Sequence, residues 1–222
     1  MKKLLRRLQE NWPSQGLATY TMVMLFTGKG DDGTTKTFGC NQRISKSSAI
    51  AEALGSVDEI NSLLGVVKMR GGKITATGGM DYHALISEVQ QDLFIVQAEL
   101  ASAEKKMDNV RVEKLSNWVN AIEKELPPIK SFFVSGGTEL GALCDYARTV
   151  ARRAERRVVE VFQGDSPAAV RGESLALKGL SSNSQVDHKD LLAYMNRLSS
   201  LLYALARLAN YRAGIAEEKP HY

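Results

Sequence analysis

The stretch LPPIKSFFVSGGTELGALCDYARTVARRAERRVV, residues 126–159, decides the fold. Two breaks interrupt its first third: the prolines at 127–128 stop a helix, and the glycines at 136–137 close an extended linker over 129–138. Thr138 can cap the helix that follows, which we expect to span about 139–162. Apolar residues recur along it at the spacings of three and four that are typical of one helix face, at Leu140, Leu143, Ala147, Val150, Ala154 and Val158.

Four other segments show the same spacing. We expect helices from Ala49 to a glycine-rich break at 71–79, over about 83–106, over about 110–126, and from a cap at Asp187 to about 213. No segment alternates convincingly between apolar and polar residues as a strand would, and no internal repeat is visible. The pattern predicts an all-α, single-domain, five-helix bundle in a ferritin-like up-down arrangement. The expected divisions are an amino-terminal appendage at 1–20, the bundle with its amino-terminal loop at 21–214, and a tail at 215–222.

The composition is that of an ordinary globular protein. Of 222 residues, 44% are hydrophobic and 24% are charged, so there is enough apolar material for a core. The net charge of +4 is too mild to demand nucleic acid as a partner. Two cysteines without CxxC spacing argue against a disulfide scaffold or a zinc site, and no apolar run is long enough to span a membrane. We expect a cytoplasmic protein, although the basic, acid-poor residues 1–20 leave an organelle leader open.

A loop rich in glycine and threonine precedes the first helix, in the stretch FTGKGDDGTT at 26–35. Glycines let the backbone approach a ligand closely, and consecutive N–H groups can form a nest for an anion. A lysine adds positive charge, and threonine hydroxyls can donate to phosphate oxygens. The loop is not a Walker A motif, because the Gly-Lys-Ser/Thr ending is absent. Composition alone favours the alternative, a polar surface loop, because short Gly/Asp/Thr motifs are common in loops.

The helix at 139–162 carries a cluster of cations. At ~100° per residue, Arg148, Arg152 and Glu155 share an arc of ~60°, with Arg156 beside them and Arg153 further round. Guanidinium groups make bidentate, permanently charged contacts that suit a polyanion such as triphosphate, and Glu155 can orient one of them. The alternative is a solvated helix face whose charges pair locally.

Three further positions carry candidate chemistry. Asp58 lies within an apolar stripe, where an acid usually needs a partner, and an arginine of another helix is the obvious one. Asn196 adjoins the inner face of the last helix and suits either an adenine edge or a structural hydrogen bond. Phe132 and Phe133 precede the diglycine and could cover a flat cofactor or belong to the core.

In this order, the motifs resemble one family, the five-helix ATP:cob(I)alamin adenosyltransferases of the propanediol-utilisation type. The resemblance runs from about Phe26 to Tyr211. Its best-matching stretches are GDDGTT at 30–35, ALGSVDEINSLLG at 53–65, QQDLFIVQAELAS at 90–102, the stretch at 126–159 and YMNRLSSLLYALARLANY at 194–211.

The resemblance implies a homotrimer in which ATP, Mg²⁺ and a reduced corrinoid (cobalamin) meet at each subunit interface, without a membrane or nucleic acid. A reductase would supply Co(I), and an adenosylcobalamin-dependent enzyme would accept the product. The implied catalytic residues are Arg148, Arg152, Glu155, Asp58 as the acid that pairs with Arg148, and Phe132 as the aromatic that faces the corrin and excludes its lower ligand. The implied ATP-binding residues are Thr27, Lys29, Gly30, Asp31, Gly33, Thr34, Thr35, Arg153, Arg156 and Asn196. No protein metal ligand is assigned, because Mg²⁺ would travel on the ATP phosphates.

The implied chemistry needs no nucleophile from the protein, since Co(I) attacks C5′ of the ribose itself. The sequence departs from the family pattern in four places: the lysine of the loop has moved one position to Lys29, Ser135 and Ser200 replace a proline and an aspartate, and the connection at 163–186 is long. The shifted lysine favours one alternative, a non-catalytic carrier or regulator that binds ATP or corrinoid. A basic helical module that binds nucleic acid is a weaker alternative, because no recognition motif is present.

Overall fold

The computed structural model describes residues 26–37, 42–131, 133–163 and 188–221. They fall into two units, which meet in sequence between Asp32 and Gly33 and are described separately. Two predicted features, the cap at Asp187 and the aromatic at Phe132, lie outside the described residues.

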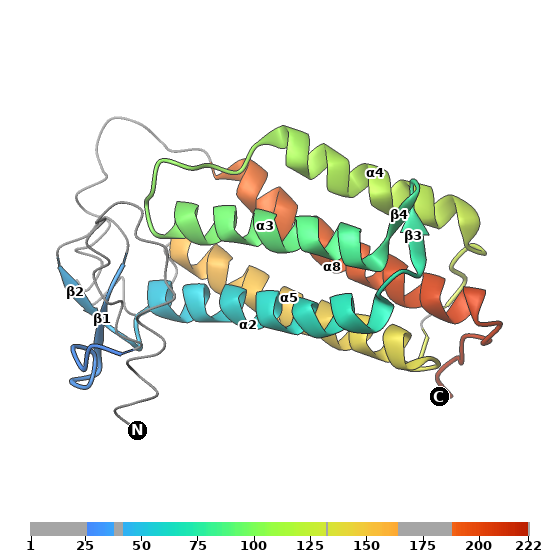
Figure 1. The fold of residues 1–222 in the computed structure, drawn as a ribbon, viewed down its shortest axis with the longest axis horizontal. Helices are drawn as coiled ribbons and strands as arrows, with labels where there is room; N and C mark the ends of the chain where they lie inside the picture. The colour runs from blue at the N-terminus through green and yellow to red at the C-terminus, as the bar shows by residue number, and fades with distance from the viewer. Residues whose placement is uncertain (1–25, 38–41, 132, 164–187, 222) are drawn as a thin grey trace, which may run out of the picture. The chain divides into compact units, whose positions relative to one another are not determined.

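The second unit contains a helical bundle (Figure 1). Its described part holds five helices: α2 (Ala49–Gly71), α3 (Tyr82–Leu100), α4 (Asn109–Glu125), α5 (Glu139–Gln163) and α8 (Lys189–Arg212). Neighbours in sequence run in opposite directions, and α2, α4 and α8 run the same way. Helix α8 packs against α4 and α5, while α2 packs against α5 and α3. The predicted up-down five-helix bundle is confirmed.

Side-chain caps explain where most of the helices begin. The residue before each of α2, α3 and α4 accepts a hydrogen bond from the first turn, namely Ser48, Asp81 and Asp108. At α5 the Thr138 hydroxyl accepts from the Gly141 N–H at 3.0 Å, which confirms the predicted cap. Helix α8 follows His188, which makes no side-chain cap bond.

Two short hairpins accompany the helices, although no strand was visible from alternation in the sequence. Strands β1 (Thr34–Lys36) and β2 (Arg43–Ser45) pair antiparallel, as do β3 (Thr75–Thr77) and β4 (Met80–Asp81). The turn of the second hairpin needs two residues with positive φ, which Gly78 and Gly79 provide at 58° and 78°. Strands of two or three residues are too short to show alternation, so the sequence pattern could not reveal them.

The expected helix over 83–106 is too long, because α3 ends at Leu100. Ser102 adopts a left-handed conformation with φ of 61°, which stops the helix. The buried Glu99 carboxylate then accepts the N–H of Met107 at 2.7 Å and fixes the chain as it turns towards α4. No glycine or proline marks this break in the sequence.

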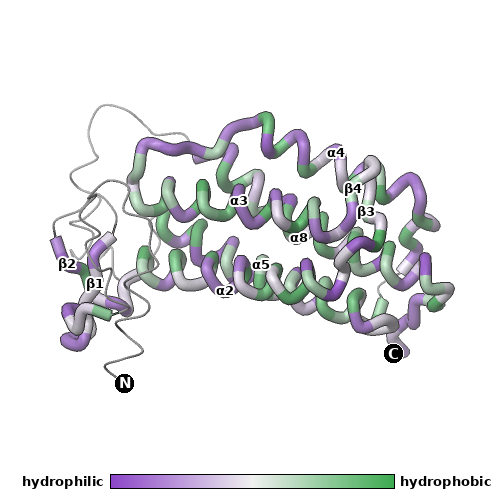
Figure 2. The backbone as a smooth tube through the Cα atoms, viewed as in Figure 1, coloured by the Kyte–Doolittle hydropathy of each residue, from purple (hydrophilic) through white to green (hydrophobic). Residues whose placement is uncertain are grey.

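The core lies between the five helices, and α8 contributes most to it. Every helix carries both hydrophobic and hydrophilic residues along its length (Figure 2). Two buried tyrosines tie α3 to α8: Tyr82 donates its hydroxyl to the Leu205 carbonyl at 2.8 Å, and Tyr194 donates to Asp92 at 3.1 Å. Burial raises the pKa of Asp92 despite that bond and a second from Arg111. The interior is therefore largely apolar, and two of its tyrosine hydroxyls are bonded across helices.

Candidate functional site

A groove of about 580 Å³ lies along α5 and α8. Two arginines of α5 form one side, three polar residues of α8 form the other, and the α4–α5 linker adds an apolar and a polar side chain. The lining residues are Arg148, Arg152, Ser199, Ser200, Tyr203, Ile129 and Ser131. The groove thus combines permanent positive charge with apolar surface, a combination that suits an anion joined to a flat organic group.

Arg148 is the more restrained of the two arginines. Its Nε donates to Asp145 one turn earlier at 3.3 Å, and its guanidinium lies 5.8 Å from the ring centre of Tyr203. Asp145 is buried, and its side chain is 11% exposed. Burial also raises the pKa of Tyr203, so its hydroxyl stays protonated at neutral pH. These contacts hold Arg148 in place while its side chain remains 27% exposed to the groove.

Glu155 and Asn196 meet across the two helices. The Asn196 amide donates to the Glu155 carboxylate at 3.0 Å, while the Arg156 guanidinium donates to the backbone carbonyl of Arg152 at 3.1 Å. Arg152 and Arg156 are exposed. Asn196, which the sequence offered independently of the α5 arc, therefore lies on the same α5–α8 face as Arg148, Arg152 and Glu155.

Arg153 and Asp58 do not join this face. Arg153 forms an ion pair with Glu59 of α2, and Arg157 pairs with Glu52 of α2 at 3.5 Å. Asp58 is exposed on α2, and within the described part of one chain it makes no ion pair with Arg148. The pairing of Asp58 with Arg148 is therefore not formed within the described part of one chain, and it stays a prediction. The partner of Arg148 is Asp145, because residues three apart on a helix are neighbours.

The predicted phosphate loop spans the boundary between the two units. In the first unit, Gly28 has a φ of 67°, the Asp31 N–H donates to its carbonyl at 3.2 Å, and the Lys29 N–H donates to the Thr27 hydroxyl at 3.4 Å. Gly30 lies inside this turn. The positive φ at Gly28 is a conformation that favours glycine, and the role of the loop in binding phosphate stays a prediction.

In the second unit, Gly33 leads into β1, which contains Thr34 and Thr35. Arg43 of β2 donates to the hydroxyl of Thr34 and, at 2.8 Å, to its carbonyl. The Lys46 N–H donates to the Gly33 carbonyl at 3.0 Å. The hairpin thus places Arg43 beside Thr34 and Lys46 beside Gly33. Sequence reasoning missed both, because only strand pairing brings them there.

The described residues contain no group of three His, Cys, Asp or Glu side chains that could enclose a metal ion. Mg²⁺ commonly binds through substrate phosphates, waters and one or two protein oxygens. The threonine hydroxyls and acids of the loop fit that mode of binding, whereas no protein-only cage is available in this part of the chain. None of the described helices is long and apolar enough to cross a membrane.

Comparison with known proteins finds relatives of one family along most of the chain. The family model for cobalamin adenosyltransferase matches residues 25–209. The chain is 33% identical over 198 residues to the corrinoid adenosyltransferase PduO of Citrobacter freundii, spanning 86% of this chain but only 51% of that protein. It is 32% identical over 200 residues to the corrinoid adenosyltransferase of Bacillus subtilis, spanning 88% of this chain and 91% of that protein.

A solved structure resembles the fold. It is a variant of the PduO-type ATP:corrinoid adenosyltransferase from Lactobacillus reuteri complexed with cobalamin and ATP. It matches with a TM-score of 0.70 and 26% identity over 90% of this chain and all of that one. Because the family model covers most of the sequence and the architecture agrees, the chain belongs to the cobalamin adenosyltransferase family.

Proposed function

We propose that this chain transfers the 5′-deoxyadenosyl group of ATP to the cobalt of a Co(I) corrinoid. The electron pair of Co(I) attacks C5′ of the ribose, a Co–C bond forms, the C5′–O bond breaks, and triphosphate leaves with the bonding electrons. The observation that carries this assignment is the groove between α5 and α8, which is lined by Arg148 and Arg152 together with the apolar surface of Ile129 and the ring of Tyr203. The relatives named above are corrinoid adenosyltransferases, and one is complexed with both substrates.

In this proposal, Arg148 and Arg152 stabilise the negative charge that builds up on the leaving triphosphate. The Glu155–Asn196 pair orients the adenosyl end, and Arg153 and Arg156 add positive potential along the same helix. The loop from Thr27 to Thr35 holds the phosphates, and Mg²⁺, when bound to them, neutralises further charge. Phe132 supplies an apolar wall that keeps the lower ligand off the cobalt.

We further propose that the active unit is a homotrimer. Asp58 is exposed on α2 and Arg148 keeps an open side towards the groove, so an acid from a neighbouring subunit can reach the guanidinium. A reductase that makes Co(I) and an acceptor of the adenosylated corrinoid are the partners that the chemistry requires.

The experiment is adenosylation of chemically reduced cobalamin by the purified chain with ATP and Mg²⁺, with the mass of the protein checked by light scattering. Arg152→Ala should lower turnover or ATP affinity at least about tenfold, which corresponds to one charge-assisted contact of ~1.5–3 kcal/mol. Arg157→Ala is the matched control, since Arg157 lies on the same helix but pairs with α2. Binding of ATP and cobalamin without product would favour a carrier, and an Arg152→Ala protein with wild-type turnover would contradict the assignment.

A further inference from the structure

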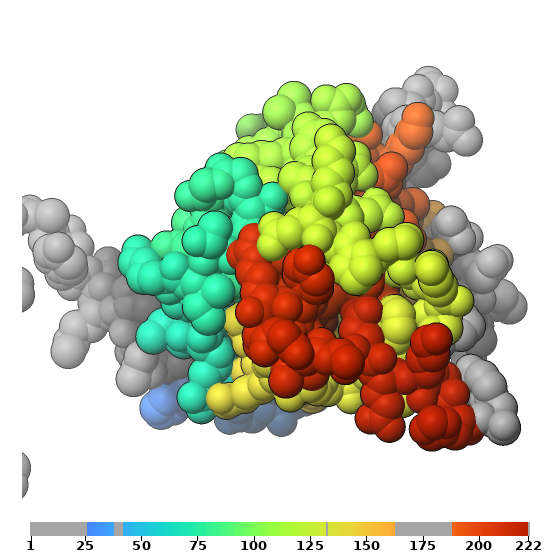
Figure 3. Space-filling view, turned by 90° about the vertical axis from the view of Figure 1, so that its right-hand side faces the viewer, coloured from blue at the N-terminus to red at the C-terminus, as the bar shows by residue number. Residues whose placement is uncertain are grey.

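The carboxy-terminal segment after α8 folds back over the linker between α4 and α5. The N–H of Val134 in the linker donates to the Glu218 carbonyl at 2.8 Å, a backbone bond of the kind that pairs extended segments. Figure 3 views this end of the bundle, with the carboxy-terminal residues in red lying beside the yellow-green connection that follows α4. The residues that follow α8 therefore contact the linker directly.

A single buried arginine joins the helix, the segment and the linker. Arg207 of α8 is only 5% exposed, and its guanidinium makes two bonds to the Glu217 carboxylate, at 2.6 and 2.9 Å. The same guanidinium donates to the Pro127 carbonyl at 3.0 Å and lies 5.4 Å from the ring centre of Phe133. A bidentate pair fixes orientation as well as distance, so Arg207 holds both the start and the middle of the linker.

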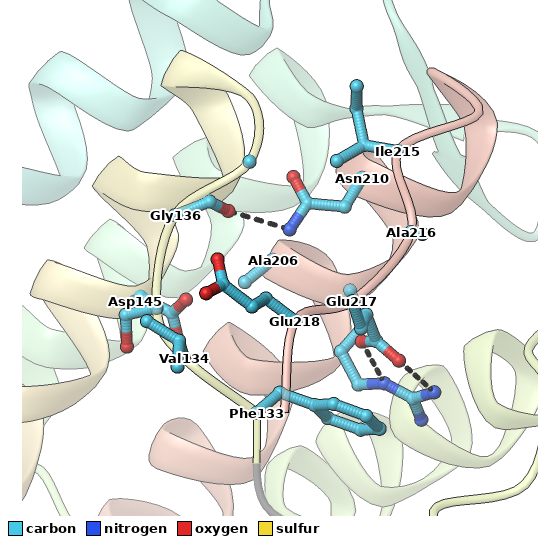
Figure 4. Close-up of a pocket in the computed structure, with 13 residues that line it drawn as sticks. Phe133, Val134, Gly136, Asp145, Ala206, Asn210, Ile215, Ala216, Glu217 and Glu218 are labelled. Carbon is cyan, nitrogen blue, oxygen red and sulfur yellow. Dashed lines mark hydrogen bonds and ion pairs between the residues drawn. The ribbon is translucent and has the colours of Figure 1, made fainter. Parts of the chain in front are cut away.

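Asn210, one turn further along α8, holds the end of the linker. Its amide donates to the Gly136 carbonyl at 2.8 Å (Figure 4). Its oxygen accepts from the N–H and from the hydroxyl of Thr138, both at 2.8 Å. Together Arg207, Asn210, Glu217 and Glu218 form what we call the linker clamp. The clamp leaves a small cavity of about 150 Å³ beside Val134 and Asp145.

The clamped linker is also part of the wall of the groove. Ile129 and Ser131 line the groove, and Asp145, which lines the small cavity, is the acid that holds Arg148. Ile129 and Val134 expose about half of their surface, at 53% and 51%. The linker thus offers apolar surface, which suits the corrin ring, whereas the cations that suit ATP lie on α5.

We infer that Arg207 and Glu217 are positioning residues for the corrinoid. They touch no substrate, and they act by holding the linker at the edge of the groove. This inference rests on the proposed function. A buried ion pair contributes little stability compared with apolar packing, but it defines geometry, and breaking it leaves an uncompensated charge. Loss of the clamp should therefore affect the corrinoid step and spare the binding of ATP.

The test compares Glu217→Gln with Glu125→Gln. Glu125, the last residue of α4, also makes a bidentate pair, with Arg212 at 2.6 and 2.7 Å; this pair is more exposed, and it joins α4 to α8 without involving the carboxy-terminal segment. Glu217→Gln should raise the KM for cobalamin or lower kcat by tenfold or more, with the KM for ATP within twofold of wild type. Glu125→Gln should leave both KM values within twofold. Arg207→Lys keeps the charge but cannot form the bidentate pair, so it should show the same corrinoid-selective loss.

Hydrogen exchange provides a readout independent of turnover. The Val134 amide should lose protection in Glu217→Gln and keep it in Glu125→Gln. A folded Glu217→Gln protein with the wild-type KM for cobalamin and the wild-type kcat would overturn the inference. The inference would also fail if the KM values for cobalamin and ATP rose equally and in proportion to a fall in Tm. Failure of the proposed function is a different result, because the wild-type chain would then form no adenosylcobalamin at all.

Discussion

Replacing Asn210 with alanine should destabilise the protein by several kcal/mol. Asn210 is 8% exposed and makes three hydrogen bonds of 2.8 Å, to the Gly136 carbonyl and to the N–H and hydroxyl of Thr138. Each such bond contributes a net ~0.5–1.5 kcal/mol, and a buried group left without a partner costs ~1–3 kcal/mol. Alanine restores none of these bonds, so we expect a loss of about 2–4 kcal/mol.

Urea denaturation followed by circular dichroism measures this loss, and Thr138→Ala is the matched control. That control removes one bond to Asn210 and the cap of α5, and it keeps the backbone bond from residue 138, so we expect about 1–2 kcal/mol. At ~2–4 °C per kcal/mol for a chain of this size, the Tm should fall by roughly 5–15 °C in Asn210→Ala. An unchanged midpoint at an unchanged denaturant slope would refute this account of the linker.

Two further predictions concern buried positions. Burial, followed by the nearby Asp145 charge, raises the pKa of Cys144 to about 12. In a Cys40→Ser background, an aromatic disulfide reagent at pH 8 should therefore find no reactive thiol in the native protein and one in guanidinium. Because the folded state favours the protonated thiol, Cys144 contributes to the free energy of unfolding. That contribution is complete below the ordinary thiol pKa and is lost as pH rises through about 12. Cys144→Ala lacks this pH-dependent loss, so its alkaline unfolding should occur at higher pH. Gly71→Ala should lower the free energy of unfolding by at least ~1–3 kcal/mol, because its Cβ would lie 2.4 Å from the Cβ of buried Tyr82. Gly65→Ala should be neutral or stabilising, because the atom nearest to its Cβ would be 3.7 Å away. Thermal unfolding of both variants checks the contrast.

The helices could be predicted because their spacing of apolar residues repeats over many turns. The expected 139–162 and 110–126 correspond to α5 (Glu139–Gln163) and α4 (Asn109–Glu125). The end of α3 could not be predicted, because it depends on a contact between Glu99 and Met107 and on the unusual φ of Ser102. The hairpins were missed because strands of two or three residues carry no periodicity.

For the site, residues on one helix were easier to predict than contacts between helices. The shared arc of Arg148, Arg152 and Glu155 follows from 100° per residue. Asn196 was identified as a candidate, but its bond to Glu155 depends on how α5 and α8 pack. The roles of Asp145 and Arg207 had no sequence signal, since an acid or an arginine on a helix is usually exposed and both are buried here.

The position of α8 also has a consequence for folding during synthesis. This helix packs against α4 and α5 and is tied to α3 through Tyr82 and Tyr194, yet the ribosome makes it after every helix that it covers. The apolar faces of those helices therefore stay uncovered until residues 189–212 leave the ribosome. At ~5–20 residues per second, synthesis of that segment alone takes roughly 1–5 s, long enough for the nascent chain to need protection by chaperones.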